Sequence, residues 1–485
     1  MTLSGAVVPV FGRHRQVVYS RAKLSLALRP LIYLRGMKGG ERRGKTFEMS
    51  TVQGASRWLN PFKRRVKMKR FIKNIALLSV VLGLAFCFST STPATAADDT
   101  IKIGLMYALS GKGSSLGTMQ MAAAKFAVKE INDKGGINFH GKKVKIEAIT
   151  ADDETNPDAA IRKMKEMILG EKIVALVGGT FADVSMALND QAKRTPVLLC
   201  WTNGVPEKVF MKENKGPYSC TPMANNQCAG RGAAGYVTEN MKMKNIVALM
   251  PDYAYGHAAY EGMEEVLKKH PDVKYQVIWT PVGTADMTQY LIRARDANPD
   301  IIMMGQWGND AINILKQAYD MELRKKTKLF FNYMTDAFAV GIPPEAIDGV
   351  TVQMFWYHDM SGFPDPQVVE ASKKINGEYL AATGGALDPY AMSGYCGVKE
   401  VVRAIELAQS TDPQKTYAAL MAHPDWNSPK GPAKWRIDGQ VAYKYDSFIG
   451  LGLPANQRAN KWDYLKIIDA YKGGSFMKPP SALGW

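Results

Sequence analysis

Short apolar segments alternate with longer segments of helical periodicity along most of this sequence. Apolar residues three or four positions apart predict an amphipathic helix, whereas a continuous apolar run of about four to eight residues predicts a buried strand. The alternation runs once before residue 220 and restarts after it. Such a pattern favours parallel sheets that helices cover on both faces. We therefore predict an α/β protein with two doubly wound, Rossmann-like units.

The predicted elements follow one another without long gaps. Strands are predicted at 101–107, 143–150, 173–177, 197–200, 245–250, 275–280, 300–304, 328–333, 350–356, 433–437 and 441–448. Helices are predicted at 119–132, 157–169, 184–193, 229–240, 257–269, 287–297, 310–321, within 366–408 and at 413–421. The 389 residues after position 96 are more than one hydrophobic core usually holds, so two lobes are expected.

The net charge of +17 is confined to one end of the chain. Residues 1–96 contain 18 Lys and Arg against two acidic residues, whereas residues 97–485 contain 44 basic and 43 acidic residues. A nucleic-acid-binding protein would carry its positive charge on the folded domain. The distribution argues against that class, and we expect no nucleic-acid partner.

Residues 68–96 have the three parts of a secretory signal peptide. The basic region is formed by Lys69, Arg70 and Lys73. An uncharged, mostly apolar run at 75–88 follows, and Ala94–Ala96 supplies an A-x-A cleavage site. The apolar run is shorter than the roughly 18–20 residues that a transmembrane helix needs. We expect export to the periplasm, with a mature chain that starts near Ala97.

Residues 1–67 have no obvious role before such a signal. They are either upstream sequence joined to a chain that starts at Met68, or a basic tail for anionic surfaces. We favour the first interpretation, and N-terminal sequencing of exported protein should then find Ala97 first. Leu84–Cys87 loosely resembles a lipidation motif, but Phe86 stands where that motif needs a small residue.

Four cysteines follow the predicted cleavage site, namely Cys200, Cys220, Cys228 and Cys396. An exported protein can form disulfides, but their spacing does not determine the pairing. No C-x-x-C pair, H-E-x-x-H motif or other zinc-like cluster is present, so we expect no metal site.

The sequence contains partial matches to three enzyme motifs, and each match lacks a required feature. Gly113–Gly117 matches G-x-S-x-G by letter, yet Ser115 lies eight residues after the strand that ends near Tyr107, not on a sharp strand–helix turn. A phosphate-binding loop fails because Gly111-Lys112 is followed by glycine instead of Ser or Thr. A dinucleotide fingerprint fails because Leu116 takes the place of its third glycine. We therefore expect no catalysis and no cofactor.

Polar and aromatic residues follow the carboxyl ends of the predicted strands, where open α/β sheets bind ligands. These residues are Ser110, Thr180, Phe181, Ala182, Asp183, Trp201, Thr202, Asn203, Asp252, Tyr253, Tyr255, Trp307, Tyr333, Thr335 and Asp336. Their shared location predicts a cleft between two lobes. Helix N-termini that open there would favour an anionic group such as a carboxylate.

Several segments closely resemble the branched-chain amino-acid binding proteins, which are type I periplasmic solute-binding proteins of ABC importers. The matching segments are 101–104, 109–111, 127–137, 152–157, 255–256 and 283–287. The resemblance spans roughly residues 101–450. It is specific to the superfamily but says little about the ligand.

The resemblance implies two lobes joined by three crossing segments, near 220–222, 350–358 and 443–448. Lobe 1 would combine 98–221 with 352–444, and lobe 2 would combine 222–351 with 445–485. Ligand binding would close the lobes like a hinge and bury the solute between them. The closed, monomeric protein would then dock to the transmembrane subunits of an ABC permease. A periplasmic sensor that signals to a membrane partner is the alternative.

The sequence departs from the amino-acid binders at the positions that would hold the ligand. Ala182 stands where the family has a serine for the ligand carboxylate, and Asp183 beside it would repel that carboxylate unless it faces away. The second-lobe glutamate that holds the ammonium has no counterpart in 331–336, where Asp336 is the possible substitute. The expected ligand-binding residues are Ala182, Asp183, Trp201, Thr202, Asn203, Tyr255, Trp307, Tyr333 and Asp336. The aromatic members suit flat ligands or cations, so the solute stays open among an amino acid, an amide and an aromatic acid.

Overall fold

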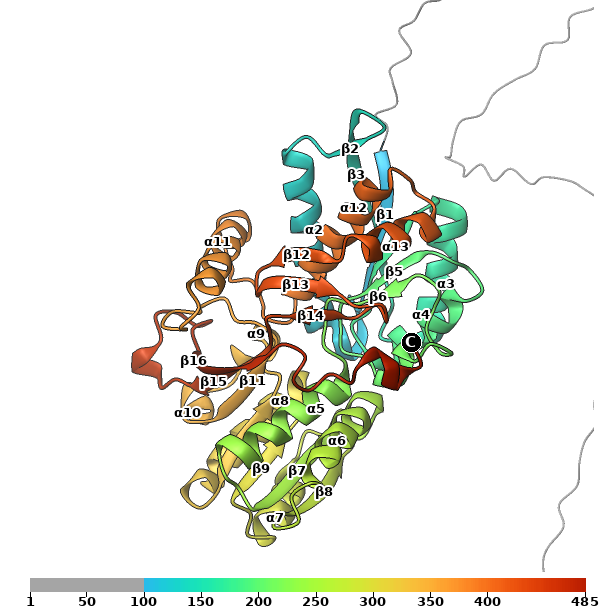
Figure 1. The fold of residues 1–485 in the computed structure, drawn as a ribbon. Helices are drawn as coiled ribbons and strands as arrows, with labels where there is room; N and C mark the ends of the chain where they lie inside the picture. The colour runs from blue at the N-terminus through green and yellow to red at the C-terminus, as the bar shows by residue number, and fades with distance from the viewer. Residues whose placement is uncertain (1–99) are drawn as a thin grey trace, which may run out of the picture. The chain divides into compact units, whose positions relative to one another are not determined.

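In the computed structural model, which describes residues 100–485, the chain forms two lobes, each built around its own sheet (Figure 1). The predicted signal peptide at 68–96 and the extension at 1–67 lie outside the described residues. Within 100–485, no helix is both long and apolar enough to cross a membrane.

The first lobe contains a six-stranded sheet in the order β2-β3-β1-β4-β5-β6. Its strands are β1 (Thr100–Tyr107), β2 (Ile137–Phe139), β3 (Lys142–Asp152), β4 (Ala175–Gly178), β5 (Leu198–Trp201) and β6 (Ser219–Cys220). All neighbours are parallel except β2 and β3. The helices of this lobe are α2 (Ser114–Asp133), α3 (Pro157–Lys165), α4 (Ala182–Ala192), α11 (Pro366–Thr383), α12 (Met392–Ala408) and α13 (Pro413–Ala422). Alternate strand residues face α2 and α12 on one side and α3 and α4 on the other.

The second lobe contains a seven-stranded sheet in the order β16-β15-β11-β10-β9-β7-β8. Its strands are β7 (Asn245–Pro251), β8 (Lys274–Thr280), β9 (Ile301–Met304), β10 (Lys328–Asn332), β11 (Thr351–Met354), β15 (Tyr445–Gly452) and β16 (Leu465–Lys472). The five strands β8, β7, β9, β10 and β11 are parallel to one another. Strand β15 pairs with β11 in the antiparallel direction, and β16 pairs with β15 in the antiparallel direction. The helices are α5 (Asn226–Gly235), α6 (Ala254–Leu267), α7 (Thr288–Asp296), α8 (Gly308–Asp320), α9 (Asp336–Ala339) and α10 (Pro344–Ile347).

The chain passes between the lobes after β6, after β11 and between two consecutive strands, β14 (Val441–Tyr443) and β15. Strand β14 belongs to a small antiparallel sheet with β12 (Asp425–Ser428) and β13 (Gly431–Trp435). Hydrogen bonds tie the crossings together: the Tyr443 hydroxyl donates to the Pro222 carbonyl at 2.7 Å, and Lys430 Nζ donates to the Asp446 carbonyl at 2.6 Å. Because Lys430 is fully buried, desolvation lowers its pKa to about 7.

Two expected lobe boundaries differ from the structure. Residues 352–354 belong to β11 of the second sheet, so the second crossing follows Met354. The last residues return to the first lobe, because Leu483 is buried in its core and Trp485 Nε1 donates to the Phe210 carbonyl at 2.8 Å. The C-terminal tail after β16 is therefore a further link between the lobes, which the sequence pattern did not reveal.

The four cysteines are buried free thiols in the described part of the chain. Cys200 and Cys220 lie opposite one another on the parallel strands β5 and β6. Burial raises the pKa of the Cys228 and Cys396 thiols, which disfavours the reactive thiolate. The structure thus leaves all four as small core residues, and no disulfide is formed within 100–485.

Helices α5 and α6 pack closely enough to require glycine at one contact. A Cβ atom added to Gly230 in α5 would lie 1.9 Å from the Ala259 carbonyl oxygen of α6. We expect Gly230→Ala to lower the free energy of unfolding by about 1–3 kcal/mol, because the helices must separate. The matched control is Gly377→Ala in α11, where nothing lies within 4 Å and the change should stabilise the chain by up to about 1 kcal/mol. Denaturant unfolding of both variants measures the difference, and equal effects would contradict the argument.

Candidate ligand-binding pocket

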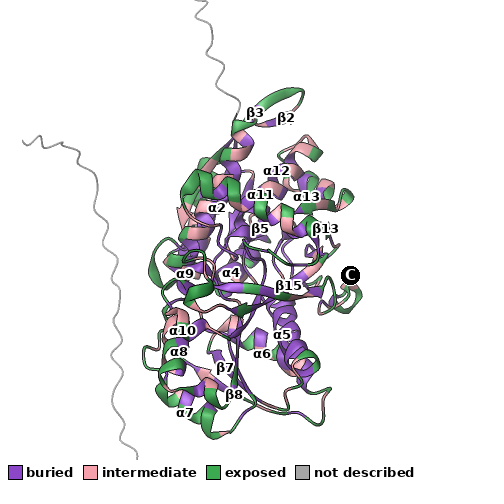
Figure 2. Cartoon of the chain, turned by 90° about the vertical axis from the view of Figure 1, so that its left-hand side faces the viewer, coloured by how far each residue is buried: buried purple, intermediate pink, exposed green. Residues whose placement is uncertain are grey.

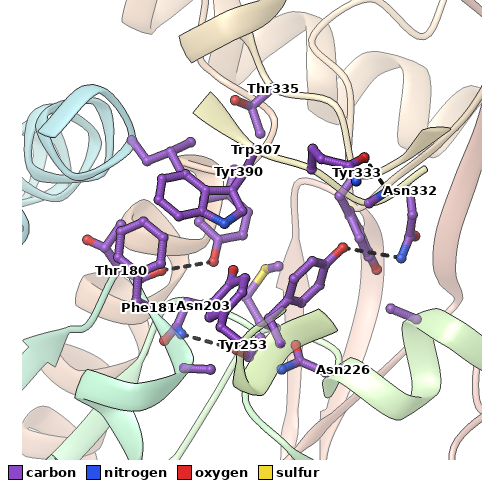
Figure 3. Close-up of a pocket in the computed structure, with 18 of the residues that line it drawn as sticks. Thr180, Phe181, Asn203, Asn226, Tyr253, Trp307, Asn332, Tyr333, Thr335 and Tyr390 are labelled. Carbon is purple, nitrogen blue, oxygen red and sulfur yellow. Dashed lines mark hydrogen bonds between the residues drawn. The ribbon is translucent and has the colours of Figure 1, made fainter. Parts of the chain in front are cut away.

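A cavity of about 70 Å³ lies between the lobes, at the carboxyl ends of both parallel sheets (Figure 3). Its lining comes from both lobes and consists of Leu116, Thr180, Phe181, Ala182, Asn203, Gly204, Met223, Ala224, Asn226, Ala229, Tyr253, Tyr255, Gly305, Gln306, Trp307, Asn332, Tyr333, Thr335, Phe338 and Tyr390. Figure 2 shows in purple the buried residues of both lobes. Of these lining residues, none is Asp, Glu, Lys, Arg or His.

The doubly wound topology brings these distant residues together. Phe181 and Ala182 follow β4, and Asn203 follows β5, in the first lobe. Tyr255 and Trp307 follow β7 and β9 in the second lobe. Because parallel strands end at the same edge of their sheet, each lobe presents its loops to the same space.

Aromatic side chains close the space from both lobes. The Phe181 and Trp307 rings, one from each lobe, lie with their centroids 4.4 Å apart. Tyr253 extends this contact, with its ring 6.1 Å from Trp307 and 6.5 Å from Phe181. These rings form one apolar cluster with Leu116 of α2. The lobes therefore touch across the cavity, and the structure is in a closed arrangement.

Several polar groups of the wall are fixed by hydrogen bonds. Asn332 Nδ2 donates to the Tyr255 hydroxyl at 3.3 Å, as Figure 3 shows. The Tyr333 hydroxyl pairs with Ser447 Oγ at 3.1 Å. Burial raises the pKa of the Tyr255 and Tyr333 hydroxyls, so both stay neutral at physiological pH.

Other polar groups of the wall lack a partner. Asn226 Nδ2, Asn332 Oδ1 and Thr335 Oγ1 are buried and make no hydrogen bond with any described residue. All three residues line the cavity. A buried polar atom without a partner costs about 1–3 kcal/mol, so these atoms are suited to bonding a ligand.

Helices α4, α6 and α8 begin at the cavity. Their N-cap residues are Phe181, Tyr253 and Trp307, which have extended backbones and form no side-chain cap hydrogen bond. The backbone N–H groups of a helix's first turn have no partner within the helix and carry partial positive charge. The aromatic caps therefore add ring surface to the wall but leave these donors uncapped.

Five of the nine predicted ligand-binding residues lie in the cavity wall, namely Ala182, Asn203, Tyr255, Trp307 and Tyr333. The other four do not. Trp201 is fully buried, because its side chain points from β5 to the α3 and α4 side, where its ring packs 5.7 Å from that of Phe210. Thr202 is also fully buried, and its hydroxyl donates to the Tyr107 hydroxyl at 3.3 Å.

The two predicted acidic residues also lie outside the cavity lining. Asp183 is exposed in the first turn of α4. Asp336 is buried beneath the wall, and Thr335 takes the lining position instead. Burial and the nearby Asp388 carboxylate raise the pKa of Asp336 well above its ordinary value. Neither residue is placed in the wall to pair with a ligand ammonium.

Some wall residues could not be found from strand ends. Asn226 begins α5, just after the first crossing between the lobes, and Tyr390 belongs to the loop before α12. The Tyr390 hydroxyl reaches the Thr180 carbonyl at 3.5 Å, across 210 residues of sequence. Asn332 is the last residue of β10, so its position at a strand end was a usable signal.

Two doubly wound lobes with a pocket between them, lined by both, have the architecture of bilobed solute-binding proteins. The family model described as periplasmic binding protein matches residues 100–446. The chain therefore belongs to the periplasmic binding protein family, and family membership implies a periplasmic location.

Relatives agree with this assignment. The chain is 23% identical over 410 residues to Leu/Ile/Val-binding protein homolog 8 of Brucella suis, which covers 81% of this chain and 95% of that protein. It resembles the crystal structure of a periplasmic binding protein from Burkholderia mallei, with a TM-score of 0.69, 22% identity, and coverage of 78% and 96%. It also resembles a solute-binding protein of an ABC transporter from Rhodopseudomonas palustris in complex with 3,4-dihydroxybenzoic acid, with a TM-score of 0.66, 22% identity, and coverage of 77% and 98%. All three are named as binding proteins, and the third is named as the solute-binding protein of an ABC transporter.

Proposed function

We propose that this protein is the substrate-binding component of an ABC importer. It would capture a small polar solute (a branched-chain or related amino acid, an amide or an aromatic acid) in the pocket between its lobes. The observation that carries the proposal is the cavity that both lobes line, with the Phe181 and Trp307 rings in contact across it. Ligand binding would favour this closed arrangement over an open one, because only the closed form contacts the solute on all sides.

We also propose that the protein is exported and that its partner is a membrane permease. The predicted signal peptide at 68–96 would direct export, and cleavage would release a mature chain near Ala97. The closed protein would then deliver its solute to the transmembrane subunits of a permease. A ligand sensor could use the same fold, and adjacent permease and ATPase genes would favour import over sensing.

A solute screen tests the binding function. A ligand that binds only the folded protein raises its stability, by about 2.7 kcal/mol when its concentration is 100 times Kd. We expect at least one of the amino acids, amides or aromatic acids to raise the melting temperature and to reduce the radius of gyration in small-angle scattering. If no solute in these classes changes either quantity, the proposed function is wrong.

A further inference from the structure

We propose that the solute is an aromatic carboxylate without an amino group, with its ring among the aromatic side chains and its carboxylate toward the uncapped helix N-termini. This inference rests on the proposed function and names the ligand class of the same pocket. The charge, the hydrogen-bonding groups and the shape of the cavity wall distinguish between an amino acid, an amide and an aromatic acid.

The charge of the wall argues against an amino acid. An α-ammonium group that leaves water needs a carboxylate partner, since a buried unpaired charge costs several kcal/mol. Of the residues that line the cavity, none is acidic, and Asp183 and Asp336 are not among them. An amino acid would therefore bury its ammonium without a counter-charge.

The helices argue for an anion over a cation. An aromatic wall alone would also suit a quaternary ammonium group. However, α4, α6 and α8 direct the positive ends of their dipoles to the cavity, which favours negative charge and disfavours positive charge. The N-cap residues of other helices differ from these. Helices α3, α11 and α13 are capped by Asn156, Asp365 and Asp412, and each of these side chains accepts a backbone N–H. Helix α5, which also begins at the wall, is capped by Asn225. Helices α4, α6 and α8 have no such acceptor, so a ligand carboxylate can take its place there.

The unpartnered side chains supply an independent sign of a ligand. Asn226 is 2% exposed, Asn332 is 1% exposed and Thr335 is 5% exposed, yet each has a polar atom without a hydrogen bond. Asn226 Nδ2 and the Thr335 hydroxyl can donate to a carboxylate. Asn332 Oδ1 can accept from a hydroxyl on the ring. Neutral donors can hold a carboxylate without a basic residue, because several N–H or O–H groups together stabilise its charge.

The shape of the wall favours a flat ring as the body of the ligand. Five aromatic residues with large rings line the cavity, namely Phe181, Tyr253, Tyr255, Trp307 and Tyr333. Aromatic pairs gain about 0.5–1.5 kcal/mol beyond their buried area when they meet offset or edge to face. A branched aliphatic side chain would forgo this gain against the same surfaces.

Paired ligands that differ in one group test the inference. The protein purified from cells that export it would be titrated calorimetrically with benzoate, benzamide, 3-phenylpropionate, L-phenylalanine and L-leucine. We expect an aromatic carboxylate to bind, and L-phenylalanine to bind at least about 100-fold more weakly than 3-phenylpropionate, which lacks only the ammonium. Benzamide should bind at least about 10-fold more weakly than benzoate.

The possible failures are distinguishable. If L-phenylalanine or L-leucine binds as tightly as the carboxylates, the ligand class is wrong, whereas the binding function stands. If benzamide matches benzoate, the anion argument is wrong. If no amino acid, amide or aromatic acid binds and scattering detects no closure, the proposed function fails as well.

A charge inserted in the wall provides a second test. Ala182→Asp places a carboxylate in the first turn of α4, where it would compete with the ligand carboxylate. We expect benzoate affinity to fall by at least about 100-fold. The control is Ala187→Asp, on the same helix but outside the cavity lining, which should leave the affinity unchanged. Unchanged benzoate affinity in a folded Ala182→Asp variant would overturn the proposed position of the carboxylate.

Discussion

Replacing Trp307 with alanine is expected to weaken solute binding by about 100-fold, equivalent to about 3 kcal/mol. The residue contributes in two ways. Its ring forms part of the cavity wall, so its loss removes apolar contact with the solute. Its contact with Phe181 at 4.4 Å also joins the lobes, so its loss makes the closed form less favourable. Both effects act on the bound, closed state, and both should appear as a higher Kd.

A second tryptophan of the same lobe offers a matched control. Trp279 lies on β8, where its ring packs 4.2 Å from His257 and 5.6 Å from Tyr260. It does not line the cavity. Trp279→Ala should reduce stability but leave solute affinity within about twofold. Calorimetric titration of both variants with the same solute measures the contrast, and an equal loss of affinity would show that Trp307 acts only through stability.

The partner ring in the other lobe extends this prediction. Phe181→Ala should weaken binding in the same direction, because it removes the other half of the interlobe contact. The double variant should lose less affinity than the sum of the two single losses, since each single change already breaks the same contact. Strict additivity would mean that the two rings contact the solute independently and do not stabilise closure together.

Periodicity predicted the regular elements well because most of them carry a buried face. The parallel strands and the long helices lie within a few residues of their predicted positions, for example β7 at Asn245–Pro251 and α13 at Pro413–Ala422. The strands that were missed have weak signals. Strands β2, β6 and β12 have three, two and four residues, and β16 reads LKIIDAYK, with charged residues among the apolar ones. The single strand predicted at 441–448 is two strands, β14 and β15, which belong to different sheets.

The candidate site was harder to predict because a strand end does not fix the direction of a side chain. Trp201 is the last residue of β5 and Asn203 follows two residues later, yet Trp201 is buried in the core and Asn203 lines the cavity. Tyr390 approaches from a loop without a neighbouring strand, so only the tertiary packing of α12 brings it to the cavity. The cavity lies at the sheet edges that the sequence predicted for the ligand, but the side chains at those edges depend on strand parity and on long-range packing.

Asp336 and Asp388 are two buried carboxyl groups that lie near one another, and neither lines the cavity. Asp388 accepts hydrogen bonds from the backbone N–H groups of Tyr390 and Ala391 at 2.8 Å and of Ala337 at 3.3 Å. Asp336, which is 1% exposed, accepts no backbone N–H from the described residues, and the buried Tyr464 hydroxyl lies beside its carboxyl group. Burial raises the pKa of both carboxyl groups, and raises that of Asp336 well above its ordinary value, so Asp336 is the one that more strongly favours the protonated form.

Asp336→Asn is accordingly expected to stabilise the unliganded protein at pH 7, because a neutral amide removes the cost of keeping a buried carboxyl group protonated. That cost is about 1.4 kcal/mol for each pH unit between the unfolded and the folded pKa. Burial and Asp388 raise the pKa of Asp336 in the folded state, whereas an unfolded aspartate has a pKa of about 3.9. Below pH of about 4 both states hold the proton, so the carboxyl group causes no pH-dependent loss. As the pH rises above that value, the unfolded state releases its proton first, and wild-type stability falls. The advantage of the variant should therefore be small near pH 4 and grow toward neutral pH.

The same Asp-to-Asn substitution at the neighbouring Asp388 is expected to lower the stability of the protein. Asp388→Asn removes a carboxylate that accepts three backbone N–H groups, so it should destabilise the protein by about 1–3 kcal/mol at pH 7. Denaturant unfolding of both variants at pH 4 and pH 7 measures these effects. A loss of stability in Asp336→Asn at pH 7 would mean that the Asp336 carboxylate is ionised and paired in solution. In that case the second lobe would hold a charge able to act on the solute, and the argument against an amino-acid ligand would weaken with it.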